Sequence, residues 1–163
     1  MIVTDIKQQV KRAGRYSIYF DSKYLFSLSE TELLRSGIRI GKEYSKSEIE
    51  DLQQTAVSDK AYMRALDYLA MRPRSQWEVT DYLRRKDYDS PTIEAILNKL
   101  SEYGYLDDKK FAQAWIDNRQ LLKPTSLRRL QQELQQKHVS RETISEVLAE
   151  QDIDEQAMLR QLI

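Results

Sequence analysis

The segment Ser75–Lys86, SQWEVTDYLRRK, has a counterpart 51 residues later in Ser126–Lys137, SLRRLQQELQQK. Each copy begins with serine, ends with lysine and carries a leucine at the same position, Leu83 and Leu134. Apolar residues in both copies recur at the three- and four-residue spacing of an amphipathic helix. We therefore predict two equivalent helices in which Leu83 and Leu134 are equivalent core residues.

A second matching pair follows these segments, with DSPTIEAIL at Asp89–Leu97 and SRETISEVL at Ser140–Leu148. An earlier helix aligns as well, pairing Ala65 with Ala112 at an offset of 47 residues, so the second copy carries four extra residues near the sequence LLKP. A three-helix unit of about fifty residues, present twice, matches the size of helical arrays. The predicted fold class is mainly α, with tandem three-helix repeats.

The first thirty residues have the alternating pattern of strands instead. In Arg15–Ser29, RYSIYFDSKYLFSLS, two alternating runs flank Asp21-Ser22-Lys23, which has the composition of a turn. We predict a small N-terminal β-hairpin extension, followed by short helices, one of them within Lys42–Leu52. The predicted parts are residues 1–57 (β-rich extension), 58–106 (first three-helix repeat), 107–150 (second repeat) and 151–163 (first helix of an incomplete third repeat).

Helix starts are marked by capping residues. Ser75 with Glu78 three residues later predicts a capping box, and Ser90 before Pro91 predicts an N-cap with proline at the first helical position. Ser140 is the corresponding cap of the last helix. Asp107 and Asp108 precede another helix and are expected to be caps rather than Mg²⁺ ligands.

The composition limits the function classes. The 163 residues contain four Gly, three Pro and no Cys, and 32% are charged. Such a chain favours helices with wet outer faces, and it holds no disulfide or thiolate metal site. No apolar run is long enough to span a bilayer and no apolar leader follows Met1, so we expect a cytoplasmic protein with no membrane partner.

Charge is segregated although the net charge is zero. Residues 72–86 hold five basic and two acidic side chains and residues 87–108 one basic and six acidic. In the second copy, residues 119–141 hold six basic and one acidic, and residues 142–160 one basic and six acidic. Either cluster alone has the charge of an ordinary solvated helix face, but their recurrence predicts a basic stripe suited to phosphates, which lysine and arginine bind without reading sequence.

Motifs for catalysis, cofactors or metals are absent from the sequence. There is no phosphate-binding glycine loop, nucleophile elbow or metal-binding helix motif. The single histidine, His138, follows Lys137 and is expected to be a polar residue at a helix end. Trp77 and Trp115 lie at helical spacing and are expected to anchor the core rather than stack on bases. We predict no enzyme activity, cofactor or metal.

Three segments resemble the RecX family, whose members bind and modulate the RecA recombinase. They are Ala65–Lys86 (ALDYLAMRPRSQWEVTDYLRRK), Ala95–Arg119 (AILNKLSEYGYLDDKKFAQAWIDNR) and Leu130–Ile144 (LQQELQQKHVSRETI). The resemblance implies tandem three-helix repeats without enzyme activity. It implies that the protein binds the RecA–DNA filament and modulates RecA, most simply by inhibiting strand exchange and ATP hydrolysis. The processes concerned are recombination, DNA repair and the SOS response.

The implied partners are the RecA filament and single- and double-stranded DNA, bound by a monomer without sequence specificity. The residues predicted to face DNA or the filament groove are Arg72, Arg74, Arg84, Arg85, Lys86, Arg119, Lys123, Arg128, Arg129 and Lys137.

Two features depart from the family pattern. The family usually has glycine after the lysine of its EL..K motif, whereas this chain has Asp87 and His138, which accept a left-handed helix cap at more strain. The family's usual third repeat is mostly missing, and we expect a chain with that repeat restored to bind the filament more tightly.

A helix-turn-helix transcriptional regulator is the alternative function. A recognition helix requires Asn, Gln or Arg at its exposed N-terminal positions. The sequence SQWEVTDYL offers Glu78 and Asp81 there, which read bases poorly. An enzyme is a distant third.

Overall fold

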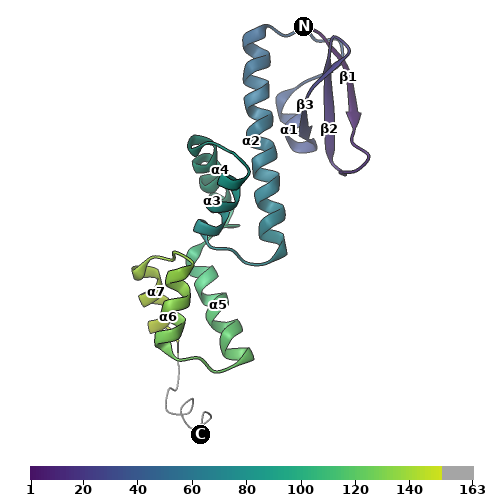
Figure 1. The fold of residues 1–163 in the computed structure, drawn as a ribbon. Helices are drawn as coiled ribbons and strands as arrows, with labels where there is room; N and C mark the ends of the chain where they lie inside the picture. Colours follow the sequence, from purple (N-terminus) through teal and green to yellow (C-terminus); the bar gives the residue numbers. More distant parts are fainter. Residues whose placement is uncertain (152–163) are drawn as a thin grey trace. The chain divides into compact units, whose positions relative to one another are not determined.

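The structure is a computed structural model that describes residues 1–151 and divides into two compact units. The N-terminal unit is Met1–Arg64, and the second unit begins at Ala65 (Figure 1). The predicted helix of a third repeat, which we expected to fold back on the second repeat, lies outside the described residues.

The N-terminal unit contains the predicted hairpin within a three-stranded antiparallel sheet of order β1-β2-β3. The strands are β1 (Val3–Gln8), β2 (Arg15–Phe20) and β3 (Lys23–Ser29). Asp21 and Ser22 connect β2 to β3 with φ angles of 46° and 68°. Two consecutive positive φ angles are those of the tight hairpin turn whose twist matches the strands, so the predicted turn is confirmed.

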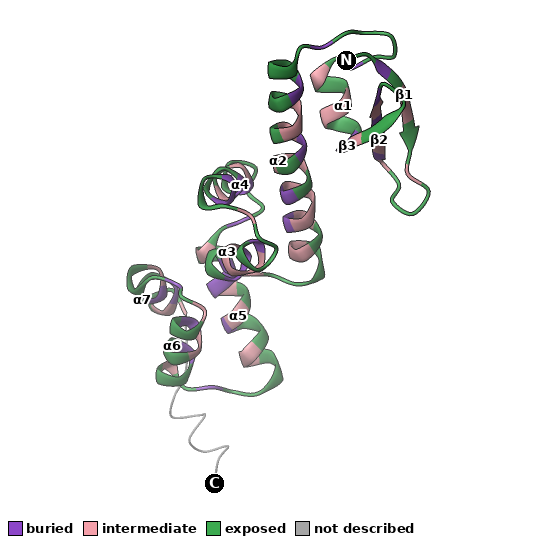
Figure 2. Cartoon of the chain, turned by 45° about the horizontal axis from the view of Figure 1, so that its top comes forward, coloured by how far each residue is buried: buried purple, intermediate pink, exposed green. Residues whose placement is uncertain are grey.

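Alternation along the strands places one face of the sheet in a core. Ile18, Phe20 and Leu28 are fully buried, and two helices contribute to the same core, α1 (Glu30–Ser36) and α2 (Lys46–Met71). Figure 2 shows buried residues on the strands and at intervals along α2. The sheet can leave one face in water because its strands are antiparallel.

Helix α2 corrects the prediction of separate short helices in this region. It begins after Ser45, as expected, but continues without a break to Met71. The helix predicted within Lys42–Leu52 is therefore only its first part, and the boundary placed after residue 57 falls inside it. Residues 53–60 contain neither glycine nor proline, so nothing in this stretch stops the helix.

A buried ion pair joins the sheet to α2. The Arg15 guanidinium lies 3.4 Å from the Asp59 carboxylate, and both side chains are less than a tenth exposed. Arg15 also donates hydrogen bonds to Ser27, while Ser29 donates its backbone N–H and its hydroxyl to Asp59 at 2.8 and 2.6 Å. Buried charges are tolerated only when paired and hydrogen-bonded in this way.

The second unit carries the two predicted three-helix repeats. The end of α2, α3 and α4 form the first, and α5, α6 and α7 form the second (Figure 1). The bounds are α3 (Gln76–Arg85), α4 (Ser90–Glu102), α5 (Asp108–Leu122), α6 (Leu127–Gln136) and α7 (Arg141–Ala149).

Equivalent residues of the two repeats occupy equivalent core positions. Leu83 and Leu134 are both fully buried, as predicted, and Ile93 and Ile144 are at most 5% exposed. Because these pairs follow the 51-residue offset, the repeat of the sequence is a repeat of the packing. The mainly α fold with a small N-terminal β extension is thus confirmed.

The helix caps agree with prediction at most positions. Ser75 accepts the Glu78 N–H while Glu78 accepts the Ser75 N–H, which completes the capping box. At α4 the prediction was wrong by one residue, because Asp89 rather than Ser90 accepts the N–H of Thr92. A carboxylate one residue earlier reaches the third helical N–H as well as a hydroxyl does.

The caps of α5 and α7 were predicted correctly. Asp107 accepts the N–H groups of Lys109 and Lys110, and Ser140 accepts the N–H of Thr143. Asp89 and Ser140 are 51 residues apart, so the capping position itself is repeated.

Asp87 and His138 follow α3 and α6 with φ angles of 66° and 58°. Both residues therefore adopt the left-handed helix cap that we expected them to accept. In each case the next residue donates its N–H back to the buried leucine carbonyl, Tyr88 to Leu83 and Val139 to Leu134.

Candidate nucleic-acid interface

The ten predicted basic residues lie on the second unit, at the connections and ends of its helices. Five of them form ion pairs with carboxylates: Arg72, Arg74, Arg85, Arg119 and Lys137. The other five form no ion pair among residues 1–151: Arg84, Lys86, Lys123, Arg128 and Arg129. The predicted stripe thus separates into five cations with a carboxylate partner and five that form no ion pair among the described residues.

Three of the paired cations surround one buried carboxylate. Glu78 at the start of α3 receives Arg72 at 2.7 Å, Lys137 at 3.6 Å and Arg74 at 3.9 Å. Burial raises the pKa of Glu78, but the hydrogen bonds from Arg72 and Ser75 and the charge of Lys137 outweigh it, so the pKa lies below its usual value. Glu78 is therefore ionised at neutral pH and holds the end of α6 against the start of α3.

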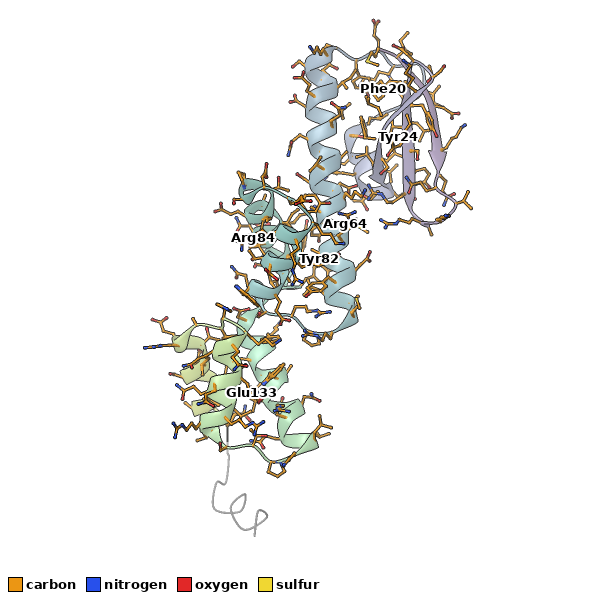
Figure 3. The ribbon with its side chains drawn as sticks, in the orientation of Figure 1. Phe20, Tyr24, Arg64, Tyr82, Arg84 and Glu133 are labelled. Atoms are coloured by element: carbon orange, nitrogen blue, oxygen red, sulfur yellow. The ribbon has the colours of Figure 1, made fainter. Side chains whose placement is uncertain are left out.

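An aromatic stack lies beside this carboxylate. The rings of Tyr68 on α2 and Tyr82 on α3 are parallel, with centroids 4.1 Å apart (Figure 3 labels Tyr82). Arg74 covers the free face of Tyr68 at 3.8 Å, and Lys86 lies 5.8 Å from the Tyr82 ring. Each cation is attracted to the negative face of its ring. Arg74 therefore contacts both the aromatic stack and the Glu78 carboxylate.

The second repeat has a matching ion pair. Arg119 at the end of α5 donates two hydrogen bonds to Glu133 of α6, at 2.9 and 2.7 Å. These hydrogen bonds raise the pKa of Arg119. Arg72 and Arg119 are equivalent in the repeat, so in both copies the arginine at the end of the first helix holds a glutamate of the second.

Arg128 and Arg129 lie together on the exposed face of α6. With Ser126, Gln132 and Glu133 they line an open polar hollow of about 520 Å³, which Gln136 completes. Figure 3 labels Glu133 on α6 and Arg84 on α3. No described contact joins Arg84, Lys86 or Lys123 to this hollow.

Trp77 is not the core residue that we predicted. It is 40% exposed, and its ring stacks on that of His138 with centroids 4.2 Å apart. Trp115 is partly buried against the core of the second repeat, with Lys137 over its ring at 5.5 Å. Trp77 lies at the start of α3, and its ring packs against His138 at the end of α6 rather than against the core of its own repeat.

The two repeats are joined by further polar contacts. Gln76 donates its backbone N–H to the Asp108 carboxylate at 2.8 Å, which links the starts of α3 and α5. Burial, together with the charges of Asp107 and Glu78, raises the pKa of Asp108 despite this hydrogen bond.

The sequence reading missed a group of cations in the N-terminal unit. Arg12 precedes β2 by three residues, and Lys60 and Arg64 lie one turn apart on α2 next to Asp59. The basic segment KRAGR, at residues 11–15, is visible in the sequence. The Arg15–Asp59 pair sets this segment beside α2, a contact that no local sequence pattern indicates.

Residues 1–151 contain no group of three or more His, Cys, Asp or Glu side chains that could hold a metal ion. The helices of the same residues include none with the length and hydropathy of a bilayer-spanning segment.

Three family models match this chain along most of its length. They are the RecX N-terminal domain at residues 1–45, the first RecX three-helix domain at residues 61–100 and the second at residues 107–148. The last two matches coincide with the two structural repeats.

Curated relatives and solved structures agree with these matches. Regulatory protein RecX of Listeria monocytogenes serotype 4a is 34% identical over 92% of this chain and 56% of its own length. That of Bacillus subtilis is 32% identical over 94% of this chain and 58% of its own length. This chain therefore spans little more than half of these relatives.

A crystal structure of regulatory protein RecX superimposes with a TM-score of 0.76 at 29% identity, covering 91% of this chain and 72% of the other. RecX from Lactobacillus salivarius gives a TM-score of 0.55 at 26% identity, covering 56% of this chain. The sequence resemblance, the repeats and the fold lead to one conclusion: the chain belongs to the RecX family.

Proposed function

We propose that this protein is a non-enzymatic regulator that binds the filament formed by RecA on DNA and restrains strand exchange and ATP hydrolysis. The relatives that it resembles are named regulatory proteins. The observation that carries the proposal is the set of five basic side chains that the fold leaves without carboxylate partners among residues 1–151. Cations that no internal acid neutralises are the ones available to phosphates.

Arg128 and Arg129 are the centre of this proposed interface. Both are exposed and both line the hollow on α6, whose other residues are polar. Phosphate groups fit such a surface because guanidinium groups donate paired hydrogen bonds to them. Arg72, Arg74, Arg119 and Lys137 contribute positive potential in this proposal, but they also form internal ion pairs: the three arginines within their own repeats, and Lys137 across to Glu78 of the other repeat.

A matched pair of variants tests the interface. Arg128→Gln with Arg129→Gln removes two positive charges, and Lys110→Gln with Arg141→Gln removes the same charge from other exposed positions of the second repeat. We expect the Arg128/Arg129 variant to weaken binding to single- and double-stranded oligonucleotides on all sequences alike. We expect its plot of log affinity against log salt to lose about two units of slope.

The regulatory role is tested with RecA itself. Strand exchange and ATP hydrolysis by RecA are measured with the wild-type chain and with both variants. We expect the wild type and the Lys110/Arg141 control to inhibit, and the Arg128/Arg129 variant to inhibit less. If the wild type changes neither activity, the proposed function is wrong, whatever its affinity for DNA.

A second function, sequence-specific DNA binding, is favoured by one observation on α6. Arg128, Gln131 and Gln132 are exposed near the start of this helix, where the recognition helix of a helix-turn-helix protein reads base edges. In α3 the corresponding segment is unsuitable, since Glu78 is buried within the capping box. Competition by unrelated sequences decides between the two, because a specific reader would be displaced only by its own site.

A further inference from the structure

The N-terminal unit contains a concentration of positive charge that its fold maintains. The starting point is the buried pair of Arg15 and Asp59, which sets the beginning of β2 against the middle of α2. The backbone N–H of Arg15 donates to the carbonyl of Arg12 at 3.3 Å, so the turn that carries Arg12 is fixed close to the same part of α2.

Helix α2 adds two cations at this place. Lys60 follows Asp59 directly, and Arg64 lies four residues further on, which puts both side chains on the same side of the helix. Figure 3 labels Arg64 on α2. Four cations, Arg12, Arg15, Lys60 and Arg64, therefore lie on the two segments that the Arg15–Asp59 pair joins.

Both oxygens of the Asp59 carboxylate already accept hydrogen bonds within the N-terminal unit. One oxygen of Asp59 accepts the Ser29 hydroxyl, and the other accepts the Ser29 N–H and the Arg15 guanidinium. Among residues 1–151 neither Arg12 nor Lys60 forms an ion pair, and both are exposed. Arg12 and Lys60 are thus open to solvent, and the cluster carries an excess of positive charge.

The cations are close enough to act on one another. Burial of its ammonium group lowers the pKa of Lys60, and the positive charges of Arg64, Arg15 and Arg12 lower it further. Like charges held together in this way repel, and a bound anion relieves the repulsion. Solubility alone does not require several cations to lie so close together.

We infer that Arg12 and Lys60 form a phosphate-binding site on the N-terminal unit, to which Arg64 and the buried Arg15 add positive potential. The Arg12 guanidinium presents paired donors to phosphate oxygens, and the Lys60 ammonium group supplies a compact charge. The phosphate comes either from a nucleic-acid backbone or from a small phosphorylated molecule. The site does not depend on the function proposed above, because none of its residues is among the ten basic residues of that proposed interface.

The test uses the full chain and inorganic phosphate as the first probe. Amide chemical shifts are followed during a phosphate titration of the wild type, of Arg12→Gln with Lys60→Gln, and of a control, Lys23→Gln with Lys46→Gln. The control removes the same charge from exposed positions of the same unit. We expect the shifts of the wild type and control to centre on residues 11–15 and 60–64, and the Arg12/Lys60 variant to bind at least tenfold more weakly.

The source of the phosphate is identified by repeating the titration with a mononucleotide and with a short single-stranded oligonucleotide. Tighter binding of the oligonucleotide than of the mononucleotide, lost in the Arg12/Lys60 variant, identifies a nucleic-acid backbone. The reverse order identifies a small phosphorylated molecule. Equal affinity of the wild type and the Arg12/Lys60 variant for every probe would overturn the site. If the Arg12/Lys60 variant loses phosphate binding but still inhibits RecA, the proposed function stands without this site. If the wild type binds phosphate through this site but does not inhibit RecA, the site stands without the proposed function.

Discussion

Leu134 and Leu122 show how differently two leucines of one repeat contribute to stability. Leu134 is fully buried among the core residues of the second repeat, whereas Leu122 is 73% exposed. We expect Leu134→Ala to lower the free energy of unfolding by about 2–5 kcal/mol, because it removes buried methyl groups and leaves a cavity. Urea denaturation measures this, with Leu122→Ala as the control, which should change stability by less than about 0.5 kcal/mol.

Glu78 makes stability depend on pH. Its pKa is lower in the folded chain than in the unfolded chain, so the folded state gains stability from the ionised form. That contribution is complete above the unfolded pKa of about 4.3 and is lost as the pH falls through the folded pKa. Replacing Glu78 by Gln removes this dependence and leaves Arg72 and Lys137 without their counterion.

The measurement is urea denaturation of the wild type and Glu78→Gln between pH 3 and 7. We expect the variant to be less stable by about 1–3 kcal/mol at pH 7, with the difference shrinking toward pH 3. A difference that stays constant over this range would show that the charge of Glu78 contributes nothing.

At the scale of the helix, the left-handed caps Asp87 and His138 give a matched comparison. Glycine adopts this conformation without the strain that a Cβ causes. We expect Asp87→Gly to raise the free energy of unfolding by about 0.5–1 kcal/mol, since glycine's greater unfolded-state entropy offsets part of the relief. His138→Gly should gain less, because it also removes the ring that stacks on Trp77.

Thermal denaturation of both glycine variants checks this expectation. An equal gain at the two positions would mean that the Trp77–His138 stack does not stabilise the junction of the repeats.

The element scale also shows what the sequence could and could not predict. Hairpin, repeats, capping box and paired core leucines were all predictable, because each depends on periodicity or on a local cap. The length of α2 was not, since its middle has weak apolar spacing and its continuity follows only from the absence of Gly and Pro. The exposure of Trp77 depends on His138 of the other repeat, which no local pattern contains.

The candidate interface was predictable only in part, for a similar reason. Sequence located the basic residues, but an ion pair such as Arg119–Glu133 depends on how helices pack. The cluster of Arg12, Lys60 and Arg64 was missed because its two segments are distant in sequence. Charge counts along a chain do not show which charges the fold neutralises.

On the scale of the whole molecule, net charge is a poor guide to partners. Lysine and arginine together number 26, as do aspartate and glutamate, so the chain is neutral overall. Among residues 1–151 several cations of each unit nevertheless form no ion pair, while carboxylates are engaged in caps and ion pairs. Cations that lie together produce a local positive potential whatever the net charge, so a neutral protein can still bind a polyanion.

The buried pair of Arg15 and Asp59 should also affect the rate at which the N-terminal unit unfolds. These residues are 44 positions apart, whereas each strand of the sheet pairs with its neighbour in the chain. Short loops close at a smaller loss of chain entropy, so the sheet should assemble first and the pair should form after the folding barrier has been crossed. Asp59→Asn should then unfold many times faster while refolding at an almost unchanged rate.

Stopped-flow measurements in urea distinguish the two rates, and slowed refolding would place the pair within the transition state. Since Asp59 also fixes Ser29 and the turn of Arg12, its substitution would shorten the lifetime of the folded N-terminal unit as a whole. We therefore expect a single carboxylate, in the middle of α2, to determine the lifetime of the folded N-terminal unit.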